Sequence, residues 1–135
     1  GPVIVLDSYA WVEHFAGTDR GKTIRAYLAE GAISPSIVLA EVARKYLREG
    51  FRKGDVVKRL NFIMARSDLQ EINVDIAIAA SEAYGELSFK AEREKIGKPS
   101  LADGIVLATA RWAKLKLISG DRHFKGLPEV IYIGE

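Results

Sequence analysis

Cysteine is absent from the 135-residue sequence, which excludes disulfide bonds and thiolate metal sites and fits a reducing compartment. The two histidines, His14 and His123, are too few for a histidine-rich zinc or copper site. Apolar runs stay well short of the ~18 residues that indicate a membrane span, and no signal-peptide pattern opens the chain. We therefore expect a cytoplasmic protein without a membrane partner.

An excess of one charge is also missing, since 20 basic residues face 18 acidic ones and the net charge is +2. This balance is compatible with a nucleic-acid partner but does not require one. With 48% hydrophobic residues, the chain is expected to form one globular domain over residues 3–135, and Gly1-Pro2 looks like a protease-cleavage scar. The basic residues cluster on what we expect to be mostly solvated helix faces, at Arg44-Lys45, Arg52-Lys53, Lys58-Arg59 and residues 90–98.

Short apolar runs alternate with segments of helical periodicity, which predicts an α/β fold with a mostly parallel five-stranded sheet. The strands are expected at Val3–Leu6, Gly31–Ser34, Glu71–Val74, Leu115–Ser119 and Val130–Ile133. The helices are expected from Ser8 to residue 17, over Lys22–Glu30, from Ser36 to Gly50, from Asp55 onward, from Asp75 to near Gly97, and from Ser100 through Trp112.

Four acidic residues are predicted near the carboxyl edge of that sheet, where open parallel sheets bind ligands. Asp7 and Asp121 follow strands, Asp103 opens an apolar helix, and Glu41 lies in the early turns of another helix. Carboxylates that lie close together raise one another's pKa, and a divalent cation relieves the repulsion. Oxygen ligands without cysteine or clustered histidine favour Mg²⁺ or Mn²⁺, and such a site can support phosphodiester hydrolysis.

Three of these acids have a purely structural alternative that the sequence leaves open. Asp7 or Ser8 can cap the helix that follows the first strand. Ser100 and Asp103 have the spacing of a capping box, although an aspartate is short for that role. Asp121 suits a turn or a helix cap.

Glu41 is the weakest of the four candidates when periodicity alone is considered. It falls on the polar face of its helix, together with Arg44, Lys45 and Arg48. An exposed ion pair between Glu41 and Lys45 therefore competes with a catalytic role.

Four segments, in order along nearly the whole chain, carry a resemblance to a known family: Val5–Ser8, Ser34–Glu41, Ser100–Ala110 and Leu117–Phe124. The sequence resembles a PIN domain, and its compact form is similar to the VapC-type toxins of prokaryotic toxin–antitoxin pairs. The resemblance implies a PIN-like three-layer α/β/α sandwich and a Mg²⁺- or Mn²⁺-dependent endoribonuclease.

The resemblance also implies roles for the acidic residues. Asp7, Asp103 and Asp121 would hold the metal, while Glu41 would complete the acidic pocket and position the attacking water. Ser119 stands where the family more often has threonine, and its hydroxyl would orient a carboxylate or a phosphate.

Contacts with RNA and with protein partners are implied less directly. Arg122, His123 and Lys125 are candidates for the RNA backbone, and Tyr9 or Trp11 for stacking on an unpaired base. Both aromatic residues are more often core or interface residues, and a histidine such as His123 more often lies in a surface loop. Family members of this kind usually form a homodimer and are inhibited by a small antitoxin, here a VapB-like one.

Other functional classes fit less well or stay open. A haloacid-dehalogenase phosphatase would need a second aspartate at position 9, which is Tyr9, and a receiver domain would need paired acids after the first strand and a lysine after the fifth. A PIN nuclease of RNA maturation and a non-catalytic metal- or RNA-binding PIN-like module both remain alternatives to the toxin.

Overall fold

The computed structural model describes residues 1–135, and its centre is a five-stranded sheet in the order β3-β2-β1-β4-β5. Every neighbouring pair of strands is parallel, so the sheet is wholly rather than mostly parallel. The strands are β1 (Ile4–Leu6), β2 (Ala32–Pro35), β3 (Asp68–Gln70), β4 (Lys116–Ser119) and β5 (Val130–Tyr132).

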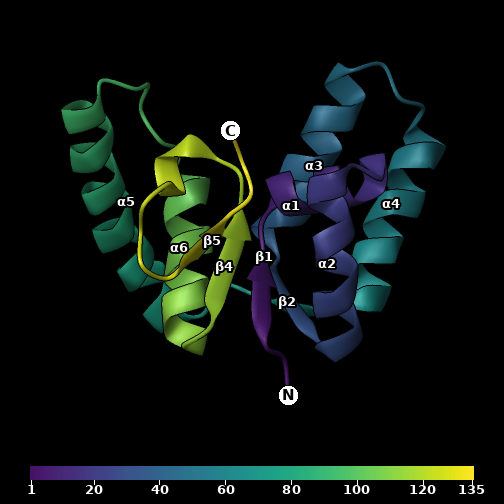
Figure 1. Ribbon diagram of the computed structural model, residues 1–135, viewed down its shortest axis with the longest axis horizontal. Helices are drawn as coiled ribbons and strands as arrows, with labels where there is room; N and C mark the ends of the chain where they lie inside the picture. The colour runs from purple at the N-terminus through teal and green to yellow at the C-terminus, as the bar shows by residue number, and fades with distance from the viewer.

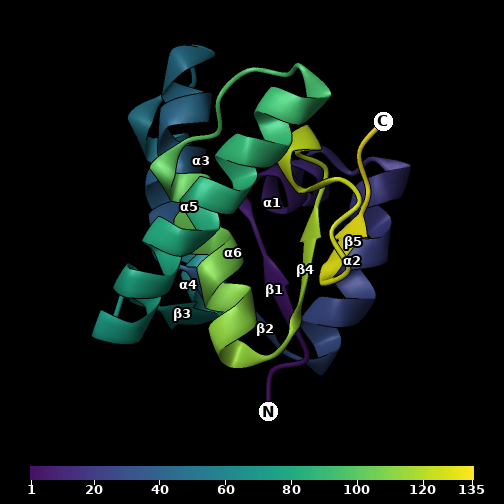
Figure 2. The same ribbon diagram turned by 90° about the vertical axis from the view of Figure 1, so that its left-hand side faces the viewer.

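Helices cover both faces of this sheet, which confirms the three-layer α/β/α architecture (Figures 1 and 2). One layer holds α1 to α4, and the other holds α5 and α6. None of the helices combines the length and the apolar character that crossing a bilayer needs. Their bounds are α1 (Ser8–Ala16), α2 (Asp19–Glu30), α3 (Ile37–Arg48), α4 (Lys53–Arg66), α5 (Val74–Glu94), α6 (Leu101–Ala113) and the short 3₁₀ helix η1 (Arg122–Phe124).

The chain reverses its direction across the sheet between β1 and β4. From β1 it proceeds to β2 and β3 on one side, and it later returns through α5 and α6 to β4 and β5 on the other side. Right-handed crossovers then place the first four helices on one face and the last two on the opposite face. The carboxyl ends of β1 and β4 therefore form a topological switch point, where open α/β sheets bind ligands.

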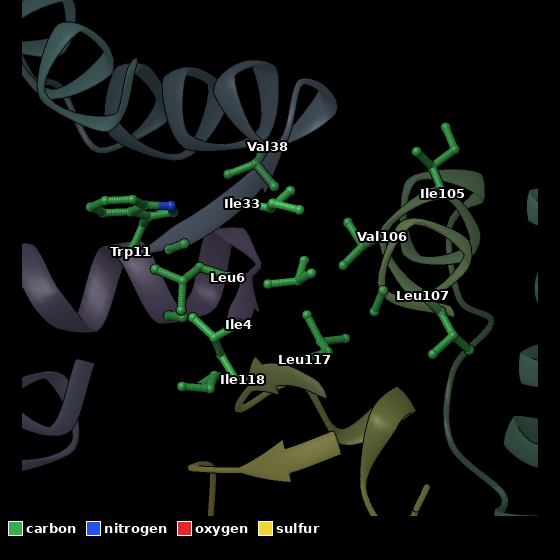
Figure 3. Close-up of a cluster of buried hydrophobic side chains, with 14 of the residues drawn as sticks. Ile4, Leu6, Trp11, Ile33, Val38, Ile105, Val106, Leu107, Leu117 and Ile118 are labelled. Atoms are coloured by element: carbon green, nitrogen blue, oxygen red, sulfur yellow. The ribbon is translucent and has the colours of Figure 1, made fainter. Parts of the chain in front are cut away.

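The core lies on both sides of β1, whose three residues are all buried. Figure 3 shows Val106 of α6 facing the strand side chains from one side and Trp11 of α1 lying on the other. Trp11 is completely buried, and its indole N–H donates to Ser34 Oγ at 2.9 Å, so its one polar group has a partner in the interior. This packing fixes the start of α1 against the sheet and thereby fixes the end of β1.

The sequence-based prediction of the third strand was wrong by a few residues. The strand is Asp68–Gln70 and pairs with β2, whereas the predicted Glu71–Val74 segment lies outside the sheet. A strand cannot continue through this segment, because Asn73 is the N-cap of α5. Its Oδ1 accepts the Ile76 N–H at 2.8 Å, and the helix begins at Val74. An edge strand with a single apolar residue gives no periodic signal, while the exposed Ile72 and Val74 imitate one.

Three predicted helix starts also differ from the structure. Helix α2 begins at Asp19 rather than at Lys22, and Asn73 rather than Asp75 caps α5. Of the two possible caps of α1, Asp7 is the cap and Ser8 is the first helical residue. Helix α4 begins at Lys53, so Asp55 lies in its first turn instead of capping it. Acidic residues are favourable in a first turn as well as at a cap, which explains the error.

Candidate metal centre

A cavity of about 380 Å³ opens where β1 and β4 end. All four predicted acids line it, and they come from four different places in the chain: Asp7 after β1, Glu41 in α3, Asp103 in α6 and Asp121 after β4. The structure therefore brings the four carboxylates to one site, as the positions of the strand and helix ends predicted.

Asp7 both caps a helix and faces the cavity. Its Oδ1 accepts the Ala10 N–H at 2.8 Å, and its residue is only 4% exposed. The pKa of Asp7 is raised to about 7, mainly by burial and to a smaller extent by the charges of Asp121 and Glu41. Hydrogen bonds from Ser119 and from the Ala10 N–H oppose this rise. At neutral pH, Asp7 therefore binds a proton readily unless a cation replaces it.

Ser119 and Asp121 form a turn at the carboxyl end of β4. The buried Ser119 Oγ accepts the Asp121 N–H at 2.9 Å, so the serine orients the backbone that carries the carboxylate. Asp121 Oδ1 accepts the His123 N–H at 2.9 Å and thereby caps η1. Its Oδ2 receives no hydrogen bond from the protein, which leaves this oxygen for a ligand.

His123 links this turn to the loop that precedes α6. Its Nδ1 lies 2.7 Å from Asp121 Oδ1, and its Nε2 lies 2.7 Å from the carbonyl oxygen of Gly97. Burial lowers the pKa of His123, but the Gly97 carbonyl and the carboxylates of Asp121 and Asp103 raise it more, so the net pKa is above the ordinary value. Both neighbours are acceptors, and an imidazolium that donates from both nitrogens satisfies them.

Asp103 forms the capping box that its spacing suggested, although an aspartate is short for this role. Its Oδ2 accepts the Ser100 N–H at 2.9 Å, and Ser100 Oγ accepts the Asp103 N–H at 3.2 Å. The structural alternative is thus correct, and it coexists with a place in the cavity. Burial raises the pKa of Asp103, and the charge of Asp121 adds to this effect. Asp103 Oδ1 has no hydrogen-bond donor from the protein.

The packing of α6 against α5 holds Asp103 in place. A methyl group built on Gly104 would lie 2.7 Å from the Ala80 carbonyl oxygen, so the two helices approach closely at the residue next to Asp103. The helix is buried from Gly104 to Ala110, as its apolar sequence predicted.

Glu41 lies in the cavity and not in a surface ion pair. Lys45 pairs with Glu49 at 2.7 Å instead, which removes the competing interpretation of Glu41. Burial raises the pKa of Glu41 to about 7, and the charges of Asp103 and Asp121 contribute, while a hydrogen bond from Ser8 opposes the rise. Periodicity ranked Glu41 low because the polar face of α3 turns toward the cavity rather than toward bulk solvent.

The potential ligand atoms form a tight set and a looser one. One atom each from Asp103, Asp121 and His123 lies within 4.8 Å of the others, whereas Asp7 and Glu41 line the same cavity outside this set. The donors are mainly carboxylate oxygens, two of which lack protein partners. The buried Asp7 and the half-buried Glu41, both with raised pKa values, line the same cavity. This chemistry fits a hard divalent cation such as Mg²⁺ or Mn²⁺.

Of the two aromatic residues that were candidates for stacking on a base, only one is accessible from the cavity. Tyr9 lines the cavity, whereas Trp11 is completely buried and therefore has no face available for a base. Arg122 and Lys125 are exposed but do not line the cavity, and both ring nitrogens of His123 already have acceptors.

Sequence reasoning overlooked three cations of α3 that line the cavity. Arg44, Lys45 and Arg48 share the helix face of Glu41, a face that periodicity alone assigns to solvent. Their spacing of three, four and seven residues from Glu41 was the signal that could have identified them.

Known structures with the same fold cover nearly all of this chain. A toxin–antitoxin complex from Klebsiella pneumoniae is 23% identical with a TM-score of 0.72, and the match covers 98% of each chain. VapBC2 from Rickettsia felis, bound to a DNA fragment from its promoter, is 19% identical with a TM-score of 0.68 and 96% of each chain covered. VapC20 from Mycobacterium tuberculosis, a toxin that cleaves the sarcin-ricin loop, is 19% identical with a TM-score of 0.64, covering 94% of this chain and 98% of that one.

At these identities the similarity establishes the fold alone. A search among curated protein sequences found no match. The sequence does match the PIN domain family over residues 4–130. This range contains β1 to β4, the first residue of β5 and all four acids of the cavity. The chain therefore belongs to the PIN domain family.

Proposed function

We propose that this protein is a metal-dependent endoribonuclease that uses Mg²⁺ or Mn²⁺. The observation that carries the proposal is the convergence of four carboxylates from four separate elements on one cavity. Structural ion pairs do not explain this arrangement, because none of the four acids pairs with a lysine or an arginine. The only basic partner of the group is His123, which lies against Asp103 and Asp121.

In this proposal, Asp7, Asp103 and Asp121 hold the cation. When bound, the cation stabilises negative charge on phosphoryl oxygens and lowers the pKa of water. Glu41 orients the attacking water and accepts its proton, since a pKa of about 7 suits a general base near neutral pH. Ser119 orients the backbone of Asp121 through the hydrogen bond to its N–H.

We further propose that the protein is the toxin of a toxin–antitoxin pair and acts in the cytoplasm. Structures of the same fold include a toxin–antitoxin complex and a toxin that cleaves the sarcin-ricin loop, and they match this chain over nearly its whole length. By this analogy its partners are RNA, a VapB-like antitoxin and a second copy of the chain in a homodimer.

The test compares cleavage of a mixed single-stranded RNA by the wild type with Mg²⁺, with Mn²⁺ and with EDTA. We expect cleavage only with metal, and a loss of more than ~100-fold in Asp7→Asn and Asp103→Asn. Asparagine keeps both helix caps, so the variants should stay folded. Asp55→Asn, an exposed acid in α4, is the matched control and should cleave normally. Cleavage that persists in both site variants would overturn the proposal.

A further inference from the structure

The outer part of the cavity is lined by one face of α3, which changes charge along the helix. We refer to Glu41, Arg44, Lys45 and Arg48 as the α3 stripe. We propose that Arg44 and Arg48 bind backbone phosphates of the RNA strand on one side of the bond that is cut. This inference rests on the proposed function and adds the position of the substrate.

Helical geometry places the stripe in line with the acidic site. Relative to Glu41, the three basic residues follow at i+3, i+4 and i+7, so all four side chains share one face of α3. At ~1.5 Å per residue, Arg44 lies about 4.5 Å and Arg48 about 10.5 Å farther along the axis than Glu41. Cationic side chains thus extend away from the carboxylates over about two helical turns.

The two arginines are free to bind an anion, whereas the lysine between them is not. Lys45 Nζ lies 2.7 Å from Glu49 Oε2, so the charge of the lysine is already paired. Arg44 and Arg48 are exposed and form no ion pair or hydrogen bond through their guanidinium groups. A second hollow is lined by Lys45, Arg48 and Glu49 alone, so the surface stays concave beyond the acidic site.

The order of charges favours a strand of nucleic acid over other ligands. The acidic end accepts a phosphate only when a cation neutralises the carboxylates, whereas the arginine end attracts phosphates directly. A guanidinium binds a phosphate through two parallel N–H donors and keeps its charge at every physiological pH. A strand with one phosphate at the metal and the next ones along α3 matches both ends of the cavity at once.

The experiment measures binding of a fluorescent single-stranded RNA to the Asp7→Asn protein, which does not cut it, across a range of salt concentrations. Arg44→Ala/Arg48→Ala should weaken binding about tenfold at 0.1 M salt and reduce the slope of log K against log salt by about 1.4, the value for two lost contacts with a single strand. The charge-preserving pair Arg44→Lys/Arg48→Lys should keep most of the slope.

A matched control removes two exposed lysines of α4 that do not line the cavity. Lys53→Ala/Lys58→Ala lowers the net charge by the same amount as the arginine pair, and it should leave the slope unchanged. An equal loss in both pairs would show a general effect of charge and would overturn the proposal.

Cleavage kinetics in the otherwise wild-type protein separate binding from catalysis. Arg44 lowers the pKa of Glu41, so Arg44→Ala can change both steps. Arg48 lies one turn farther away, and Arg48→Ala should raise KM and leave kcat unchanged.

A drop in kcat alone, with unchanged binding, would overturn the proposal and leave the nuclease function intact. Unchanged RNA binding in Arg44→Ala/Arg48→Ala would also overturn the proposal and leave the nuclease function intact. It would indicate that the α3 stripe binds an acidic protein segment instead. Absence of any metal-dependent cleavage by the wild type would instead refute the proposed function.

Discussion

On one wall of the cavity, formed by α6 and the turn after β4, the protein supplies its own cation. Asp103 and Asp121 accept backbone N–H groups there, and His123 lies 2.7 Å from Asp121 and 4.0 Å from Asp103. On the other wall, formed by β1 and α3, neither Asp7 nor Glu41 forms an ion pair, and burial is the main cause that raises the pKa of each to about 7.

This difference explains how the site would stay stable in the absence of a cation. Helix caps occur on both walls, but only the first wall also has a histidine against its two carboxylates, so these carboxylates hold their positions in the absence of a ligand. The second wall lowers its charge by taking up protons, because burial makes two ionised carboxylates costly. A divalent cation that binds here would have to displace protons mainly from the Asp7 and Glu41 side, so we expect its binding to depend on pH.

The largest effect that follows from the comparison is a pH-dependent loss of stability in the metal-free protein. The folded-state pKa of Asp7 is about 7 against an ordinary value of 3.8, so the folded state binds the extra proton. The stability that this proton contributes is complete below the ordinary pKa and is lost as pH rises through about 7. For Asp7 the loss amounts to roughly 4 kcal/mol at high pH, and Glu41 acts in the same direction.

Urea unfolding in EDTA between pH 3.5 and pH 8.5 measures this loss, because the range begins below the ordinary pKa of Asp7. The double variant Asp7→Asn/Glu41→Gln should be more stable than the wild type at pH 8.5 and equal to it at low pH. Asp55→Asn controls for the removal of an exposed charge. Parallel curves for the wild type and the double variant would show that the second wall does not titrate in this range.

The site was more predictable from the sequence than the boundaries of the elements around it. Asp7 and Asp121 could be placed because parallel strands end at a common edge, and the apolar residues of β1 and β4 identify those ends. The edge strand β3 could not be placed, since it is held by backbone pairing with β2 and buries little of its own side chains.

Residues whose role depends on the direction of a helix face were harder to assign. A polar stripe on α3 has the same periodicity whether it faces solvent or a cavity, so Glu41 and the arginines beyond it looked like surface residues. Their surroundings come from α1, α6 and the β4 turn, which are distant in the sequence. Nor did local patterns reveal that Asp7 and Asp103 serve as helix caps and cavity residues at the same time.

The two walls meet where the Tyr9 ring of α1 packs against Gly120, the residue between Ser119 and Asp121. A methyl group on Gly120 would overlap the ring, so Gly120→Ala should displace Tyr9 from the cavity wall. We expect a loss of about 1–3 kcal/mol in the free energy of unfolding, the usual range for overpacking. Chemical denaturation measures it, and Tyr9→Ala/Gly120→Ala should recover part of the loss. Gly54→Ala, where the added methyl group meets nothing, is the control. Equal stabilities of Gly120→Ala and Gly54→Ala would contradict the contact.

The smallest expected effect concerns the wall that already has a cation. His123→Phe keeps an aromatic ring but removes the contacts with Asp121 and with the Gly97 carbonyl. Because residues that orient metal ligands contribute to affinity, Mg²⁺ binding measured by calorimetry should weaken about tenfold. His14→Phe replaces the other histidine, which packs against Trp11 and Phe62 away from the cavity, and should bind Mg²⁺ normally. Tighter binding in His123→Phe would show that the imidazolium competes with the metal for the carboxylates. The metal would then have to displace the imidazolium from the first wall, as it displaces protons from the second.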